Sequence, residues 1–383
     1  MVIGIIGGGA SGMAAALAAS GNSQNQVIVF ERQARVGKKL LATGNGRCNL
    51  TNRKAADYHG LEPDFTHYAL KHYDVDNTLA WFSGMGLYTV TEENGRVYPY
   101  SDQANSVVDV LRFAMEKENI MLKLGFDVLK VKKTVEGFLV ESREESVACQ
   151  RLIVACGGLA GTALGGSMSG YQLLRSMGHK MTKLRPALVQ LKTAQQMTAL
   201  KGVRANCKAE ILFNREIFAQ SVGEIQFTDY GISGPVVFEI SRDVCQAKGD
   251  WVCRLDFLPE ISNAELAAMI CRPGEEMLTG ILHNRLGKVL AKAGAYDKNQ
   301  VSGIVKGFEL QLLEPMGMDK AQVTAGGVLT GEFYPETMES KLVPGLYACG
   351  EVLDIDGDCG GYNLQWAWSS GRCAGHSAGE VRV

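Results

Sequence analysis

Three glycines near the start of the chain have the spacing of a phosphate-binding turn. Gly7, Gly9 and Gly12 form a G-x-G-x-x-G pattern between an apolar run and a run of small residues. The first glycine permits a tight turn, the second lets backbone approach a pyrophosphate, and the third lets a helix pack closely on a strand. The helix N-terminus that follows this turn offers N–H groups and the positive dipole end to phosphates. The spacing predicts a dinucleotide-binding site.

An acidic residue stands where the ribose of that dinucleotide is expected. Glu31 follows Gly12 by 19 residues and ends a second apolar run, VIVFE. A carboxylate there accepts hydrogen bonds from ribose hydroxyls. It also disfavours a 2′-phosphate, so the site should not prefer NADP. Lys38 and Lys39 follow, and they are expected either near phosphate or the adenine-side ribose, or on the surface as solvated charge.

A second candidate helix start lies near the other end of the chain. Residues 346–375 read LYACGEVLDIDGDCGGYNLQWAWSSGRCAG, which predicts a strand, an acidic loop and a helix opened by GGYNLQ. Backbone N–H groups at such a helix start stabilise negative charge on the N1/O2 edge of a reduced flavin. Gly350 and Glu351 end the predicted strand, from where they can reach the ribityl chain and pyrophosphate. The sequence therefore favours FAD over NAD.

A polar, glycine-rich stretch, TGNGRCNLTN, occupies residues 43–52. Asn45, Arg47 and Asn49 could donate to flavin ring oxygens, N5 or the pyrophosphate. The alternative is a loop whose Asn and Thr side chains bond to its own backbone. We expect cofactor contact, with the individual roles unassigned.

Cys48 lies in this stretch where disulfide reductases of the same fold carry a C-x-x-x-x-C pair. The next cysteine in the chain is Cys149, so no local dithiol can form. A long-range pair with Cys349 or Cys359 stays open as an alternative. We expect Cys48 to be a small buried residue without a redox role.

The acidic loop and the histidines are not arranged for a metal. Asp354, Asp356 and Asp358 resemble the start of a calcium loop, but Gln365 stands where that loop needs a Glu. The acids are expected to cap the helix or touch ribityl hydroxyls. The six histidines are scattered along the chain, and no metal site is predicted.

These residues need a scaffold of parallel strands. VIGII (2–6), MAAALAAS (13–20) and VIVFE (27–31) predict a strand, a helix and a parallel neighbouring strand. Short alternating runs over 190–255 suggest a small antiparallel barrel, and residues 262–315 read as helical. After residue 322, strand-like and helix-like runs separated by glycines recur, as in the N-terminal part. The order predicts one α/β domain split by an insert.

Composition limits the partners and the compartment. With 39 Lys and Arg against 41 Asp and Glu, the net charge of −2 gives no footprint for nucleic acid or an anionic membrane. Residues 1–19 are apolar, but five glycines interrupt them and no Lys or Arg precedes Arg32, which argues against a signal peptide or membrane span. Ten cysteines without a C-x-x-C pair are typical of reduced thiols. We expect a cytoplasmic protein with a small-molecule substrate, and the sequence does not indicate its oligomeric state.

Three segments resemble one family of flavoproteins. TGNGRCNLTN, GEIQFTDYGISGPVVFEISR (223–242) and TMESKLVPGLYACGEVLDIDGDCGGYNLQWAWSSG (337–371) resemble the BaiN-like NAD(P)/FAD-dependent oxidoreductases, which include the aminoacetone oxidases. The resemblance implies a glutathione-reductase-like, FAD-binding Rossmann domain (1–189 and 321–383). It also implies an inserted β-barrel-like domain (190–258 and 311–320) and a helical subdomain (259–310). Cys156 stands where a Thr is more usual, which puts any transfer of substrate specificity in doubt.

The pattern and the resemblance together define the expected site. The cofactor-binding residues are expected to be Gly7, Gly9, Ala10, Ser11, Gly12, Glu31, Arg32, Lys38, Lys39, Thr43, Gly44, Asn45, Gly46, Arg47, Cys48, Asn49, Cys156, Gly157, Gly350, Glu351, Asp354, Gly361, Asn363, Leu364 and Gln365. No general acid or base is assigned. Tyr98, Tyr100, Trp366 and Trp368 are expected either to wall a substrate pocket or to pack in the core.

The expected activity is FAD-dependent oxidation and reduction. Non-covalent FAD would pass two electrons, as hydride through flavin N5, between a reductant and an organic substrate or O₂. NAD(P)H is a possible transient reductant, docking between the FAD domain and the insert. A flavin-dependent amine oxidase and a non-enzymatic flavin-binding redox sensor are the alternatives.

Overall fold

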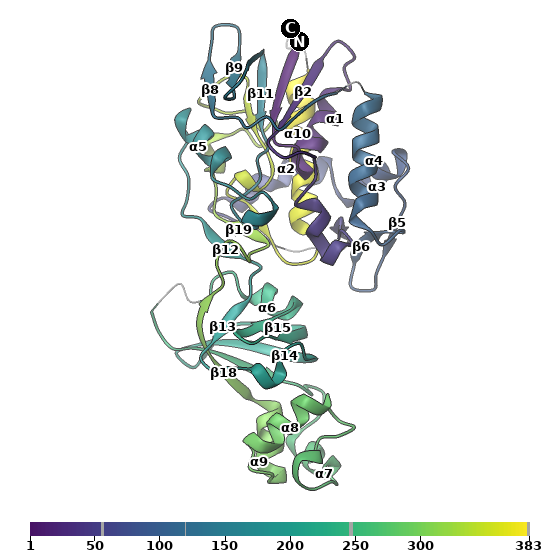
Figure 1. Cartoon of the computed structure of the whole chain (residues 1–383), viewed down its shortest axis with the longest axis vertical. Coiled ribbons are helices and arrows are strands. Elements are labelled where there is room, and N and C mark those ends of the chain that lie inside the picture. The colour runs from purple at the N-terminus through teal and green to yellow at the C-terminus, as the bar shows by residue number, and fades with distance from the viewer. Residues whose placement is uncertain (55–56, 119, 245–247, 381–383) are drawn as a thin grey trace. The chain divides into compact units, whose positions relative to one another are not determined.

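The computed structural model describes residues 1–54, 57–118, 120–244 and 248–380. The chain forms two compact units: unit 1 comprises residues 1–185 and 323–383, and unit 2 comprises residues 186–322 (Figure 1). The short strands β12 (Arg185–Ala187) and β19 (Val323–Ala325) lie where the chain passes from one unit to the other.

Unit 1 is built on a parallel sheet of five strands in the order β20-β11-β1-β2-β7. The strands are β20 (Leu346–Ala348), β11 (Arg151–Val154), β1 (Val2–Ile6), β2 (Gln26–Glu31) and β7 (Met121–Leu124). The pairing of β1 with β2 and β11 is parallel throughout. The central strands are continuous apolar runs because both faces of the sheet are covered. The predicted Rossmann-type α/β fold is confirmed.

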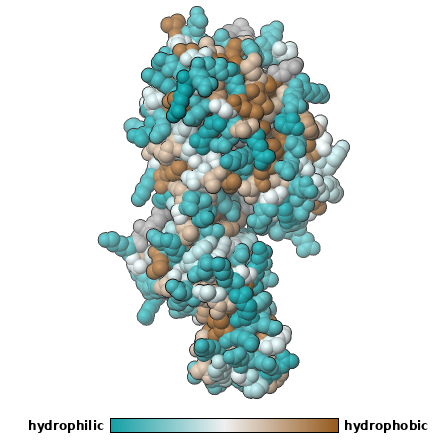
Figure 2. Space-filling view, viewed as in Figure 1, coloured by the Kyte–Doolittle hydropathy of each residue, from teal (hydrophilic) through white to brown (hydrophobic). Residues whose placement is uncertain are grey.

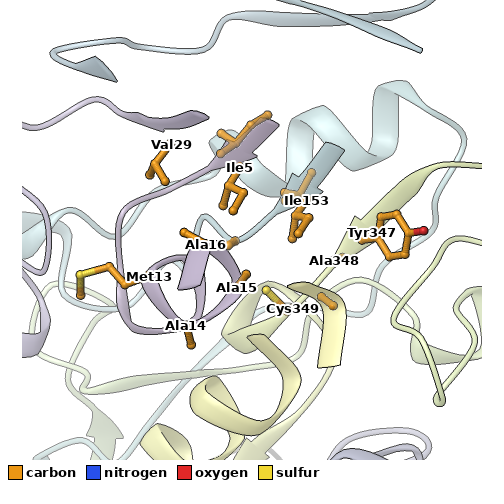
Figure 3. Packing of buried hydrophobic residues seen from close by; sticks show 14 of the residues in the cluster. Ile5, Met13, Ala14, Ala15, Ala16, Val29, Ile153, Tyr347, Ala348 and Cys349 are labelled. Atoms are coloured by element: carbon orange, nitrogen blue, oxygen red, sulfur yellow. The ribbon is translucent and has the colours of Figure 1, made fainter. Parts of the chain in front are cut away.

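Helix α1 (Ala10–Ala19) connects β1 to β2 and packs against the sheet. In Figure 3, Ile5, Val29 and Ile153 of neighbouring strands lie beside the small side chains Ala15 and Ala16 of this helix. The helix begins three residues before the predicted residue 13, because Gly9 is its N-cap and residues 10–12 (ASG) are already helical.

Helix α10 (Tyr362–Gly379) runs beside α1 (Figure 1). Three glycines of α10 form the closest contacts with α1. A Cβ added to Gly371 would lie 2.4 Å from the carbonyl oxygen of Ser11, and one added to Gly375 would lie 2.3 Å from that of Ala15. One helical turn later, a Cβ on Gly379 would lie 3.1 Å from the Ala19 oxygen. Contacts that advance by four residues on both helices show that α1 and α10 run parallel.

The remaining elements of unit 1 surround this core. The helices are α2 (His67–His72), α3 (Val75–Gly84), α4 (Ala104–Lys117) and α5 (Ser169–Ser176), with a 3₁₀ segment η2 at Pro63–Thr66. The small sheets contain β3 (Thr51–Asn52), β4 (Tyr58–His59), β5 (Thr89–Thr91), β6 (Arg96–Pro99), β8 (Lys130–Lys133), β9 (Phe138–Glu141), β10 (Ser146–Cys149) and β21 (Asp356–Gly357).

Unit 2 contains a closed barrel with the strand order β13-β16-β15-β14-β17-β18. The strands are β13 (Leu191–Thr193), β14 (Arg204–Phe213), β15 (Glu216–Phe227), β16 (Gly231–Ser233), β17 (Trp251–Asp256) and β18 (Phe308–Pro315). Alternate side chains of β17, namely Trp251, Cys253 and Leu255, are buried. The predicted barrel is confirmed.

Helices α6 (Pro235–Ile240), α7 (Asn263–Met269), α8 (Asn284–Ala293) and α9 (Lys298–Lys306) complete unit 2. The prediction that residues up to 315 are helical is wrong for its last part. Helix α9 ends at Lys306, and FELQLLEP forms β18, which pairs with β17 and β13. Leu310 and Leu312 are buried in the barrel and alternate with the more exposed Glu309 and Gln311.

The domain bounds expected from the resemblance stay a prediction, and the two compact units have bounds of their own. The chain leaves unit 1 after residue 185 and returns at 323, against the predicted 189 and 321. Strand β18 begins at Phe308, whereas the predicted return from helical subdomain to barrel was at 311. The finer division into barrel and helical subdomain stays a prediction.

Hydrophilic residues cover most of the face shown in Figure 2. Within the described ranges, none of the helices has both the length and the apolar composition needed to cross a bilayer.

Candidate functional site

The turn before α1 and the first residues of this helix (7–12) form a concave stretch of backbone, called the cradle below. Gly7 and Gly12 are sterically required there. Gly7 has φ +108°, and a Cβ there would lie 2.4 Å from the carbonyl oxygen of Ala155. A Cβ on Gly12 would lie 1.8 Å from the carbonyl oxygen of Gly7. At Gly9, in contrast, an added Cβ meets nothing within 4 Å, so a ligand can reach this backbone directly.

The exposed backbone of that cradle is suited to phosphates. The first bond within α1 runs from the N–H of Met13 to the carbonyl of Gly9 (2.9 Å), so the N–H groups of residues 10–12 point out of the helix end. No acidic side chain lies in the first turn, and no side chain caps it. The cradle therefore fits the pyrophosphate of FAD.

Glu31 is fixed at the carboxyl end of β2. Its Oε2 accepts from the N–H of Gly8, and its Oε1 accepts from the N–H of Gln33, both at 2.8 Å. These bonds hold the carboxylate beside the glycine turn, which is where a ribose hydroxyl would meet it. Nearby, Arg32 donates to the carbonyl of Gly165, and Lys38 Nζ lies 3.4 Å from the Gln33 amide oxygen.

An ion pair joins the first and last predicted segments of the site. Lys39 Nζ lies 2.8 Å from Glu351 Oε2, and Glu351 Oε1 accepts from the N–H of Thr324 at 2.8 Å. Because both oxygens of Glu351 already have partners, its contact with a ribityl chain stays a prediction. Gly157 has φ +69°, and an added Cβ there meets nothing within 4 Å, so its backbone is also open to a ligand.

The start of α10 is a second helix end with outward N–H groups. Gly361 is its N-cap with φ +106°, and a Cβ there would lie 2.6 Å from the carbonyl oxygen of Thr51. The first hydrogen bond within the helix runs from the N–H of Gln365 to the carbonyl of Gly361 (3.0 Å). The N–H groups of residues 362–364 therefore have no acceptor within the helix and point out of its end. Asn52 Nδ2 donates to the carbonyl of Gly360 at 3.0 Å and fixes the approach to the helix.

The two helix starts have a defined offset. Since Gly371 lies against Ser11, the first residue of α1 is level with residue 370, eight residues after Tyr362. At a rise of 1.5 Å per residue, the start of α10 lies about 12 Å beyond the start of α1. A phosphate at one helix end and a flavin ring at the other, joined by an extended ribityl chain, match this separation. The two helix ends together fit FAD.

Two side chains predicted to lie at the cofactor, Gln365 and Asn363, hydrogen-bond to other parts of the protein. Gln365 is 3% exposed; its Oε1 accepts from Thr51 Oγ1 (2.7 Å), and its amide nitrogen donates to the Tyr73 carbonyl, Thr78 Oγ1 and Ser369 Oγ. Asn363 bonds the backbone of residue 357 through both its amide oxygen and its amide nitrogen, at 2.9 and 2.7 Å. These amides bond to protein, so ligand contact by residues 361–365 stays a prediction that rests on their backbone N–H groups. Asp354 is also buried, and its Oδ2 accepts from the N–H of Leu61 (3.1 Å).

The TGNGRC loop is held in a left-handed conformation. Asn45 has φ +57° and Cys48 has φ +60°, and the N–H of Cys48 donates to the Thr43 carbonyl at 3.0 Å. Gly44 and Gly46 also have positive φ, which glycine adopts without steric cost. Asn49 Oδ1 accepts from the N–H of residue 97 at 3.2 Å, so part of this loop does bond to protein backbone.

Arg47 is held by two carboxylates. Its guanidinium bonds Asp102 and Glu92 (2.9 Å to the latter) and stacks over the Tyr98 ring at 3.9 Å. The hydrogen bond to Asp102, the largest of several contributions, raises the pKa of Arg47. Its contact with the cofactor therefore stays a prediction.

Cys48 lacks the properties of a nucleophile. Its side chain is fully buried, and burial raises the pKa of its thiol to about 12. Burial likewise raises the pKa of Cys156 and of Cys349 to about 12. Cys271, in contrast, is exposed.

We expect thiol labelling to distinguish these cysteines. At about pH 8, close to the ordinary thiol pKa, a maleimide should modify Cys271 rapidly and leave Cys48 unmodified in the folded protein. Peptide mapping by mass spectrometry reports each site separately. Equal labelling of Cys48 and Cys271 under native conditions would contradict this burial, and unfolding in denaturant should make both reactive.

The aromatic residues divide between core and surface. Trp366 and Trp368 are buried, and their indole N–H groups donate to the carbonyls of Gly350 (3.2 Å) and Leu50 (3.0 Å). Their predicted alternative role in the core is confirmed. Tyr98 is buried under Arg47, and Tyr100 is exposed.

Two groups near the α10 start were missed from the sequence. Arg96 hydrogen-bonds Tyr98, and its Nε would lie 3.6 Å from a Cβ at Gly360. His59 Nε2 lies 2.7 Å from Asp358 Oδ1. These two residues are 299 positions apart, so no local spacing indicates the pair. Across the part of the chain that the structure describes, no three or more His, Cys, Asp or Glu side chains converge as a metal site.

The family comparison covers nearly the whole chain. Residues 1–377 match the family model described as HI0933-like protein Rossmann domain. The chain is 42% identical to the 3-dehydro-bile acid delta(4,6)-reductase of Clostridium scindens, over 99% of both chains. It is 30% identical to the ribosomal RNA dihydrouridine synthase of Escherichia coli, over 96% of this chain and 95% of that protein.

Solved structures share the fold at low identity. A 3-ketosteroid delta1-dehydrogenase from Sterolibacterium denitrificans aligns with a TM-score of 0.52 and 11% identity, covering 98% of this chain and 99% of that chain. A flavocytochrome c3 fumarate reductase in its open conformation aligns with a TM-score of 0.51 and 15% identity, covering 98% and 78%. The chain belongs to the HI0933-like Rossmann-domain family, to which the predicted BaiN-like resemblance points, and it is a flavin-dependent oxidoreductase.

Proposed function

We propose that this chain reduces a carbon–carbon double bond conjugated to a carbonyl group in a small organic molecule, with NAD(P)H as the reductant. The observation that carries the proposal is the 42% identity over the whole chain to a protein named as a reductase of the 4,6 double bonds of a 3-dehydro bile acid. The more distant relatives are named for making dihydrouridine, in which a double bond next to a carbonyl is also saturated. The chemistry shared by these names is reduction of an activated double bond.

Different segments of unit 1 would bind different parts of FAD. The start of α1 would bind the pyrophosphate, Glu31 the adenosine ribose, and the start of α10 the N1/O2 edge of the ring. When bound, FAD supplies the two-electron chemistry that side chains cannot perform. The outward N–H groups and dipole of α10 stabilise the negative charge that reduction places at that edge. Buried contacts such as Gln365 with Thr51 keep the helix start rigid.

Charge supports a small molecule rather than ribosomal RNA as the substrate. Unit 2 has 15 Lys and Arg against 16 Asp and Glu, and unit 1 has 24 against 25. Proteins that bind RNA present an excess of positive charge that neutralises phosphates. Neither unit has that excess.

A substrate panel tests the proposal. The holoprotein is incubated with NADH or NADPH and one of four compounds: a 3-oxo-Δ4,6 bile acid, a 3-oxo-Δ4 steroid, a uridine-containing RNA transcript or aminoacetone. We expect nicotinamide oxidation that depends on an enone, with a product two hydrogens heavier by mass spectrometry. Turnover with aminoacetone and O₂ alone would instead support the amine oxidase alternative. Turnover with RNA alone would overturn the substrate class, and a flavin that reacts with none of them would support the sensor.

A further inference from the structure

A histidine–carboxylate pair lies directly before the start of α10. His59 Nε2 and Asp358 Oδ1 are 2.7 Å apart, and Asp358 precedes the N-cap Gly361 by three residues. The side chains are 30% and 40% exposed, whereas the neighbouring Asp354 and Asp356 are buried. The pair is therefore accessible to a molecule bound at this helix end.

The backbone around the pair is fixed from several sides. Strand β4 pairs antiparallel with β21, which places His59 opposite Asp356 and Tyr58 opposite Gly357. A Cβ on Gly357 would lie 3.1 Å from the Tyr58 ring, so the two strands are in close contact. The Tyr58 hydroxyl donates to the carbonyl of Tyr362 at 3.0 Å, and the Asn363 amide closes the loop over residues 357–358. Both partners are thus held relative to the start of α10.

The pair combines short distance with access. Among the described residues, two other histidines have a carboxylate partner. His179 is 2.8 Å from Glu332 but has no exposed side-chain surface, and it stacks on Phe333. His67 is 3.5 Å from Asp64 on the open surface, with side chains 74% and 89% exposed. Of the three pairs, only His59 and Asp358 are both closely paired and placed beside a proposed flavin contact.

We propose that His59 is the proton donor to the substrate and that Asp358 is a positioning residue that orients the imidazole. This rests on the proposed function. With Nε2–H held by the carboxylate, Nδ1 is the ring position that exchanges a proton with the substrate. With FAD bound and reduced, the cofactor would supply hydride to the carbon distal to the substrate carbonyl, and His59 would give its proton to the carbon next to the carbonyl. The double bond would gain one hydride and one proton, and His59 would regain its proton from water.

Other charged and titratable groups share this environment. Asp356 is the register partner of His59 in the strand pair, the Tyr58 hydroxyl bonds the Tyr362 carbonyl, and Asp64 lies in the following segment η2. Burial raises the pKa of Tyr58 above its ordinary range, so this phenol stays protonated.

The test compares electron acceptors in the holoprotein. Anaerobically reduced native protein, His59→Gln, Asp358→Asn and the surface control His67→Gln are mixed with an enone or with ferricyanide, which takes electrons without a proton reaching carbon. For His59→Gln we expect a loss of about 100-fold or more in reoxidation by the enone, while ferricyanide reoxidation changes by less than about two-fold. In Asp358→Asn, the rate of reoxidation by the enone should fall less than in His59→Gln, and the pH profile of the enone reaction should shift. His67→Gln should match the native protein with both acceptors.

The outcomes separate this inference from the proposed function. If the native protein reduces enones and His59→Gln does so at the native rate, His59 is not the donor, and only this inference falls. If His59→Gln slows both acceptors equally or loses its flavin, the residue is structural, and the inference also falls. If the native protein oxidises its flavin with ferricyanide but with no enone, the proposed function falls and the donor role falls with it.

Discussion

Replacing Gly375 by Ala is expected to lower the free energy of unfolding of unit 1 by about 3 kcal/mol, the cost of overpacking a tight contact. The added methyl group would lie 2.3 Å from the Ala15 carbonyl oxygen and 2.8 Å from the Ala18 Cβ, on a helix that cannot move without losing its other contacts with α1. Because the offset of the two helix starts depends on this contact, FAD affinity should fall as well. Denaturant unfolding followed by circular dichroism, with and without FAD, measures both effects.

The same substitution at Gly84 is the matched control. Gly84 is the last residue of α3 in the same unit, and an added Cβ there meets nothing within 4 Å. Ala is the better helix former, so Gly84→Ala should leave stability unchanged or raise it by up to about 1 kcal/mol. Equal effects at residues 84 and 375 would contradict the close approach of α1 and α10.

Replacing Glu31 by Ala is expected to weaken FAD binding by about 100-fold, or roughly 3 kcal/mol, the upper range for hydrogen bonds to a charged group. The change removes the acceptor for ribose hydroxyls and also leaves the N–H groups of Gly8 and Gln33 without their carboxylate partner. Glu31→Gln keeps one carbonyl acceptor, so this variant should lose less FAD affinity than Glu31→Ala. Titration of apoprotein with FAD, followed by flavin fluorescence, gives the dissociation constants.

Glu93→Ala serves as the control for that experiment, since Glu93 is exposed on unit 1. It should bind FAD as tightly as the native protein. Native affinity in Glu31→Ala would remove Glu31 from the site. A Glu31→Ala variant that binds FMN normally but FAD weakly would strengthen its assignment to the adenosine end.

The spacing of nearby residues in the sequence is enough to predict the two helix starts, because tight turns at these places require glycine. The glycines at 7, 9 and 12 lie close together around one strand-to-helix turn, where Gly12 packs against the Gly7 carbonyl, so their spacing identifies the α1 start and the parallel strands beside it. GGYNLQ identifies the start of α10 for the same reason. The FELQLLEP segment reads as helical in the sequence but forms β18, because Leu310 and Leu312 alternate with period two and are buried in the barrel.

Side chains that meet across long sequence distances could not be predicted. Gln365 is polar and opens a helix, which suggests ligand contact, yet Thr51 and Thr78 converge on it from elsewhere in unit 1. Arg47 looks available in the sequence because Glu92 and Asp102 are 45 and 55 residues away. Pairing of this kind is decided by the tertiary fold rather than by spacing.

The most direct test of the central claim is a single turnover without oxygen. Holoprotein is reduced with one equivalent of NADH or NADPH, mixed with the 3-oxo-Δ4,6 bile acid in a stopped-flow instrument, and followed by its visible flavin absorption. The account predicts that NAD(P)H bleaches the flavin, that the enone restores its absorption, and that one equivalent of saturated product forms. A flavin that stays reduced with every enone, or that aminoacetone bleaches while NAD(P)H does not, would contradict it.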